Sequence, residues 1–85
     1  MIDLKTASKI AIEFVQSIYP DNTDLQVEEI ETTEDGKYWL ITIGMYDLTG
    51  IKGTLAALAP KPRKYKAVQI NKEDGLVQSM KIRKV

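Results

Sequence analysis

The sequence of 85 residues contains no cysteine and no histidine. Without cysteine, the chain can form neither a disulfide nor a thiolate metal site. Without histidine, it lacks the usual general base, the usual pH-sensitive side chain and the commonest metal ligand. The Cys–His and Ser–His–Asp arrangements of nucleophilic catalysis are therefore excluded. We expect a protein that is not an enzyme and that uses no cofactor.

Other chemical motifs are incomplete. The carboxylates of residues 21–31 lack the spacing of a calcium-binding loop. Residues 50–54 lack the four-residue gap of a phosphate-binding loop. Residues 47–50 read Asp-Leu-Thr-Gly, so a leucine interrupts the Asp-Thr/Ser-Gly motif of aspartic proteases. We therefore expect no metal site.

The sequence also has no long hydrophobic run. Its longest uncharged and largely apolar stretch, residues 54–60, is far too short to span a bilayer. Residues 1–5 have neither the cationic nor the apolar region of a signal peptide. These absences predict a cytoplasmic protein with no membrane partner.

The tripeptide Glu-Asp-Gly occurs twice, at residues 34–36 and 73–75, each time between runs that alternate apolar and polar residues. Glycine supplies the positive φ that closes a tight turn. The pattern therefore predicts two β-hairpins. Their four strands are expected at residues 25–32, 37–46, 64–71 and 76–83.

The N-terminal segment has the periodicity of one helical face. The apolar residues at this spacing are Leu4, Ala7, Ile10, Ala11, Phe14, Val15 and Ile18. Asp3 is suited to cap the helix and Pro20 to end it. The fold class expected is α+β: a single domain over residues 1–85, with one N-terminal helix packed on a four-stranded antiparallel sheet in two layers, and a loop insert at residues 47–63.

Two positions break the strand alternation. Ile30 is out of phase with Leu25 and Val27, so either residues 28–29 form a bulge or Ile30 points to the opposite face. In the last strand, we expect Leu76, Met80 and Ile82 to share a face, and Gln78 interrupts that run.

Charge is unevenly distributed although the formal net charge is zero. Residues 20–36 carry seven acidic and no basic side chains, whereas residues 61–85 carry eight basic and two acidic ones. We expect these strands to attract one another or to be solvated. The alternative is a bipolar surface that steers a charged partner.

The hairpin at residues 65–81 resembles the PepSY domain family, in which an alternating strand ends in Asp or Asn, turns through a polar segment closed by Gly, and returns with a Val. The order of elements is also similar, with Ala7, Ile10, Ala11 and Phe14 on a helix followed by residues 36–39. The resemblance implies a helix on an antiparallel sheet, and a binding or inhibitory module. The related cystatin-like inhibitors use a Gln-x-Val-x-Gly loop, which this chain lacks.

The candidate site is the second face of the strand at residues 37–46. Tyr38, Leu40 and Tyr46 lie on it, and one helix can cover only the opposite face. Leu55 and Leu58 of the insert are expected to extend this surface, unless the insert folds back to cover it. The function expected is a small non-enzymatic protein-binding module of inhibitor, immunity or accessory type, and the alternative is a structural homodimer. We do not expect nucleic acid as a partner, because acidic residues balance the basic patch of residues 61–66.

Overall fold

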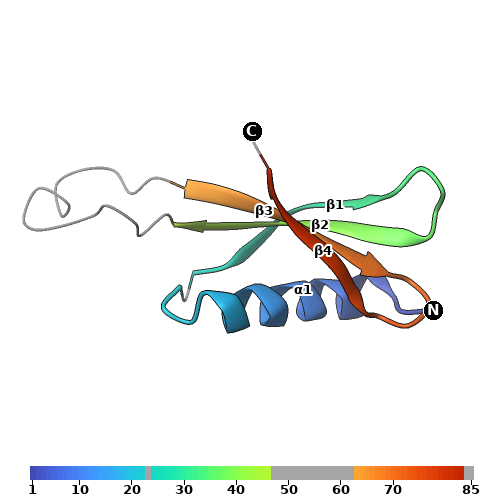
Figure 1. Cartoon of the computed structure of the whole chain (residues 1–85), viewed down its shortest axis with the longest axis horizontal. Helices are drawn as coiled ribbons and strands as arrows, with labels where there is room; N and C mark the ends of the chain where they lie inside the picture. Colours follow the sequence, from blue (N-terminus) through green and yellow to red (C-terminus); the bar gives the residue numbers. More distant parts are fainter. Residues whose placement is uncertain (23, 47–62, 84–85) are drawn as a thin grey trace, which may run out of the picture.

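The structure of the chain is a computed structural model that describes residues 1–22, 24–46 and 63–83. In chain order the elements are helix α1 (Leu4–Ile18) and strands β1 (Gln26–Thr32), β2 (Tyr38–Tyr46), β3 (Arg63–Asn71) and β4 (Val77–Arg83). The strands form one antiparallel sheet in the order β1-β2-β3-β4, and α1 lies against one side of it (Figure 1). The predicted α+β fold is thus confirmed. Arg63, predicted to belong to the insert, is the first residue of β3.

Both ends of α1 follow from single residues. The Asp3 carboxylate accepts a hydrogen bond of 2.8 Å from the backbone N–H of Thr6, which satisfies one of the free donors of the first turn. At the other end, the Tyr19 N–H donates to the Val15 carbonyl, and Pro20 follows with no N–H to donate. The helix therefore begins and ends where its sequence predicts.

The core lies between α1 and the sheet. Its fully buried members are Ala7, Ala11 and Val15 of the helix, Ile41, Ile43 and Met45 of β2, and Val68 and Ile70 of β3. The buried stripe of α1 is shorter than the predicted one, because Leu4 and Ile18, the first and last residues of the helix, are 42% and 44% exposed.

The two Glu-Asp-Gly turns have the same chemistry. In each, the aspartate accepts a hydrogen bond from the amide two residues later, at 3.0 Å from Lys37 to Asp35 and 2.9 Å from Leu76 to Asp74. The glycines that follow these aspartates have φ of 73° and 74°. Each hairpin is therefore closed by a local carboxylate and by a glycine of positive φ, and the glycine is the part that the sequence predicts.

β1 contains a bulge at Glu28, which has no register partner on β2. The neighbouring pairs are Val27 with Ile43, Glu29 with Thr42 and Ile30 with Ile41. The bulge returns Ile30 to the helix side of the sheet, beside the core residue Ile41. Of the two arrangements that the sequence allows, the structure shows the bulge.

β4 contains a second irregularity, at Gln78. Ser79 pairs with Gln69 and Val77 pairs with Ile70, so Gln78 is passed over in the register. Val77 therefore packs against the core, and Leu76 precedes the strand with 66% of its surface exposed. The prediction that Leu76 shares the face of Met80 was wrong, because the bulge changes the phase of the alternation.

The segment before α1 is fastened to the sheet. The Ile2 N–H donates to the Lys72 carbonyl at 2.7 Å, and the Trp39 indole N–H donates to the Ile2 carbonyl at 3.3 Å. The Lys72 ammonium lies 4.2 Å from the centroid of the Trp39 ring, a cation–π contact. One lysine and one tryptophan thus hold the start of the helix against the two hairpins.

Candidate protein-binding face

We call the side of the sheet turned away from α1 the outer face. Its residues on β2 are Tyr38, Leu40, Thr42, Gly44 and Tyr46, and their register partners on β3 are Asn71, Gln69, Ala67, Tyr65 and Arg63. The predicted site residues Tyr38, Leu40 and Tyr46 therefore lie on one face, because alternate residues of a strand point the same way. Leu55 and Leu58 lie outside the described residues.

The outer face is less open than its apolar residues predict. Tyr38, Leu40 and Tyr46 are half-buried, and Thr42 between them is only 1% exposed although no helix covers it. The covering groups are charged side chains from β1, β3 and β4 that lie across β2. The central part of this face is therefore closed by ion pairs and not by apolar contacts.

The first of these ion pairs crosses Gly44. Glu28, the bulged residue of β1, accepts a hydrogen bond of 2.8 Å from the Arg63 guanidinium on β3. A Cβ at Gly44 would lie 2.5 Å from the Glu28 Oε1 and 2.6 Å from the Arg63 Nη2. Glycine weakens a strand interior, so its presence here is explained by the two side chains that pass directly over it.

Arg63 is also held by aromatic neighbours. Its guanidinium carbon lies 5.1 Å from the centroid of the Tyr46 ring. Desolvation by itself lowers the pKa of Arg63, but a hydrogen bond with Tyr65 and the Glu28 carboxylate together outweigh it, so the pKa is raised. The result is a permanently charged guanidinium stacked on a tyrosine at one end of the outer face.

The second set of ion pairs starts from Arg83 on β4. Its Nη1 donates to the Thr42 hydroxyl at 3.2 Å, and its Nη2 lies 3.2 Å from Glu29 and 3.4 Å from Glu31. On a flat sheet β4 and β1 are three strand spacings, or about 14 Å, apart. These contacts require strong twist, and Figure 1 shows β4 crossing the other strands at a steep angle.

Sequence reasoning missed Arg63, Tyr65 and Arg83 as members of the outer face. The attraction between acidic and basic strands was predicted, and the structure assigns it to these two arginines. One signal for the close contacts was available in the sequence: Gly44 stands in the middle of a strand otherwise rich in β-branched and aromatic residues.

The described residues hold no group of three or more His, Cys, Asp and Glu side chains placed to bind a metal ion. In the same part of the chain, no helix has both the length and the apolar character needed to cross a membrane. The outer face presents aromatic rings, guanidinium groups and hydrogen-bonding side chains.

Comparison with known proteins gives no match: no family model matches the chain, and neither the curated proteins nor the solved structures include one of significant similarity. The resemblance to PepSY domains therefore rests on the residues of the sequence and stays a prediction.

Proposed function

We propose that this protein is a small protein-binding module that recognises its partner through the outer face. The observation that carries the proposal is the set of tyrosine and arginine side chains on that face: Tyr46, Tyr65, Arg63 and Arg83 are neighbours at one end, and Tyr38 lies next to Leu40 farther along β2. Tyrosine and arginine are the side chains most enriched, with tryptophan, at the energetic centres of protein interfaces. The cation–π contacts on the helix side of the described residues involve lysine instead, with Lys64 and Lys66 near Tyr19 and Lys72 near Trp39.

The ion pairs support this role because they fix the arginines before a partner arrives. Arg63 is held between Glu28 and Tyr46, and Arg83 between Glu29 and Glu31. Ordering a flexible arginine on binding costs about 0.5–1.5 kcal/mol, and a side chain that is already ordered avoids most of that cost. The outer face is therefore suited to a partner that presents planar polar groups and apolar surface together.

The type of module follows the predicted resemblance to PepSY domains. An inhibitory, immunity or accessory role is consistent with a chain that has no histidine or cysteine for catalysis. In this proposal the protein acts by occupying a surface of another protein, and it changes no covalent bond itself.

The proposal is tested with matched double variants. Tyr38→Ser with Leu40→Ser removes apolar surface from the outer face without adding charge. Leu4→Ser with Ile18→Ser removes apolar surface elsewhere, since these two residues are 42% and 44% exposed and both belong to α1, on the opposite side of the sheet. Each chain is first shown to be folded by its melting curve, then immobilised and exposed to lysate of its native host.

We expect a protein that the wild type and the second variant retain and that the Tyr38/Leu40 variant loses, and direct titration should then give the same ranking of affinities. Retention that is equal for all three chains, or retention of no protein by any of them, contradicts the assignment to the outer face.

A homodimer through the same face is the second candidate. The observation that favours it is the opposite charge of the edge strands, with Glu29 and Glu31 on β1 and Lys81 and Arg83 on β4. A two-fold axis parallel to the strands would place β1 of each copy over β4 of the other. Dilution through the micromolar range should then lower the melting temperature. A transition that does not depend on concentration contradicts the homodimer.

A further inference from the structure

The edge of β4 that faces away from β3 is a second surface of the sheet, distinct from the outer face. Within the described sheet β4 pairs with β3 alone, so the backbone groups on its other side have no strand partner. Its register with β3 is regular from Ser79 to Arg83, and the irregularity at Gln78 ends that regular stretch. Five residues of regular strand, from Ser79 to Arg83, therefore have an edge without a strand partner in the described sheet.

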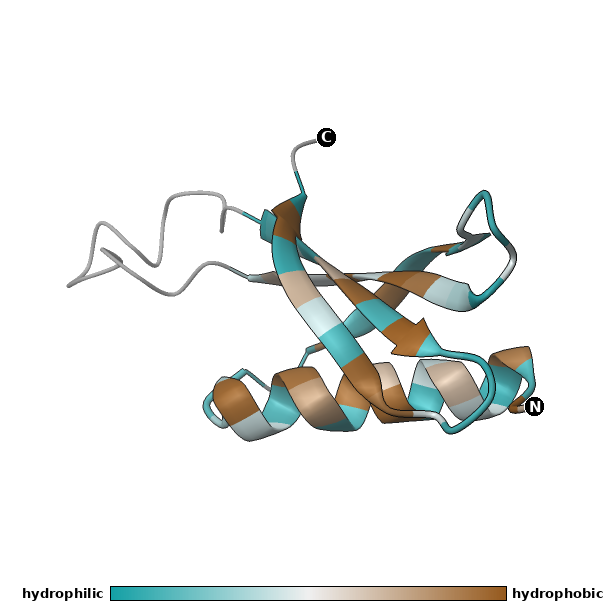
Figure 2. Ribbon diagram, turned by 45° about the vertical axis from the view of Figure 1, so that its right-hand side comes forward, coloured by the Kyte–Doolittle hydropathy of each residue, from teal (hydrophilic) through white to brown (hydrophobic). Residues whose placement is uncertain are grey.

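The helix side of this edge is apolar and exposed. Met80 and Ile82 pair with Val68 and Lys66, so they lie on the helix side of the sheet. Met80 packs against the core, but Ile82 is 74% exposed. Figure 2 shows the reason: β4 starts beside α1 and then runs away from it, so the C-terminal end of the strand has no helix beneath it. A strand added beside β4 would cover Ile82 with its own apolar side chains.

The other side of the same edge is basic. Lys81 is exposed on the outer face and makes no ion pair within the described residues, and Arg83 follows it two positions later. An acidic side chain on an added strand would lie across from Lys81, whereas Arg83 is already paired with Glu29 and Glu31. Opposite charges on neighbouring strands contribute stability, and like charges directly across from each other are unfavourable.

We propose that the edge of β4 from Ser79 to Arg83 binds an extended segment of a partner protein, whose residues alternate apolar toward the helix side and acidic toward the outer face. Backbone hydrogen bonds supply the affinity, and Ile82 and Lys81 select the pattern. A second copy of β4 is the wrong occupant, because antiparallel pairing about Lys81 brings the lysines of the two copies together.

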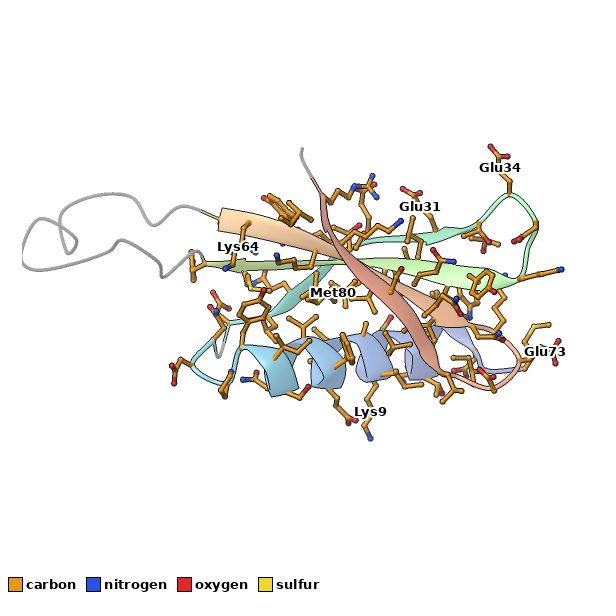
Figure 3. The ribbon with its side chains drawn as sticks, in the orientation of Figure 1. Lys9, Glu31, Glu34, Lys64, Glu73 and Met80 are labelled. Carbon is orange, nitrogen blue, oxygen red and sulfur yellow. The ribbon has the colours of Figure 1, made fainter. Side chains whose placement is uncertain are left out.

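The probe is the acetylated and amidated peptide Thr-Val-Glu-Val-Glu-Val-Thr, titrated into the isotope-labelled full chain while amide chemical shifts are recorded. We expect shifts at residues 79–83, and binding about fivefold weaker when both glutamates of the peptide are replaced by lysine. Lys81→Glu should reverse that preference. Lys9→Glu makes the same change of charge on the exposed side of α1, where Figure 3 shows Lys9 pointing away from the sheet, and should leave it unchanged.

Backbone pairing is tested with two N-methylated forms of the peptide, one methylated at its valines and one at its glutamates. In a strand, alternate amides point to opposite edges, so exactly one form should lose binding. The Tyr38→Ser/Leu40→Ser variant should bind the parent peptide normally, which separates this proposal from that for the outer face. Equal binding of both methylated forms, equal binding of the glutamate and lysine peptides, or shifts confined to residues outside β4 would overturn it.

Discussion

Arg83 and Glu29, from the two edge strands of the sheet, form an ion pair in which the Nη2 and Oε1 atoms are 3.2 Å apart. The same guanidinium donates to the Thr42 hydroxyl on β2 between them. A residue near the end of the chain thus closes the outer face over a strand 41 positions earlier. The twist that brings β4 to this position also separates it from α1, so one feature shapes both proposed binding surfaces.

We expect Arg83→Met to lower the free energy of unfolding by about 1–2 kcal/mol, because the buried Thr42 hydroxyl loses its donor and two carboxylates lose their shared cation. Urea denaturation at low salt measures this, and high salt should reduce the difference. Lys81→Met is the matched control on the same strand and face, with an expected change within about 0.5 kcal/mol. Equal effects of the two substitutions would contradict the ion-pair geometry.

The effect of Gly44→Ala on the free energy of unfolding should depend on the two side chains that lie over Gly44, Glu28 and Arg63. In a background that carries both Glu28→Ala and Arg63→Ala, alanine should stabilise the strand by about 0.5–1 kcal/mol, because glycine is the poorer strand residue and neither side chain then passes over it. In the wild type the new Cβ meets the Glu28 carboxylate at 2.5 Å, and displacing this side chain should remove the gain. A double-mutant cycle from chemical denaturation gives the coupling energy. Additive effects would show that the Glu28–Arg63 ion pair does not lie over Gly44.

Neighbouring substitutions in β4 test the irregularity at Gln78. Val77→Ala removes side-chain volume packed against the core and should cost about 1–2 kcal/mol of unfolding free energy. Leu76→Ala removes a larger but exposed side chain and should change stability by less than about 0.5 kcal/mol. Thermal or urea unfolding ranks the two variants. The reverse order would restore the simple alternation in which Leu76 belongs to the core face.

The helix cap makes stability depend on acid pH. The hydrogen bond from Thr6 lowers the pKa of Asp3 below its ordinary value of 3.8. Because the folded-state pKa is the lower one, the stabilisation is complete above pH about 3.8 and is lost as the pH falls through the folded-state value. Asp3→Ala should therefore melt at a lower temperature than the wild type at neutral pH, and the difference should shrink in acid.

The control for this pH dependence is Asp21→Ala, which changes charge equally at an exposed residue outside the helix. Its melting temperature should differ little from that of the wild type at either pH. A pH-independent difference for Asp3→Ala would mean that the carboxylate does not cap α1 through its charge.

Local chemistry made the elements predictable from the sequence. Asp3 and Pro20 set the helix, and the two aspartate–glycine pairs set the hairpins, because each acts within a few residues of itself. The phase of β4 was mispredicted, since a bulge at Gln78 depends on how the strand pairs with β3 and not on its own alternation.

The candidate face was predictable only in part. Alternation places Tyr38, Leu40 and Tyr46 on one side of β2, and the structure agrees with that placement. The groups that cover the face come from positions 35 and 54 residues distant in the chain, as in the contacts of Glu28 with Arg63 and of Glu29 with Arg83. Such contacts depend on sheet twist, which no local pattern specifies.

Tyr46 and Arg63 are register partners, so the backbone leaves β2 and re-enters β3 at adjacent points. Any connection between these two ends has to span only the distance between paired strands, about 5 Å, so a change in its length costs the sheet little loop-closure entropy. A two-residue turn or a foreign epitope inserted between Tyr46 and Arg63 should therefore leave the register of β2 and β3 intact. The domain could then serve as a scaffold that displays grafted sequences.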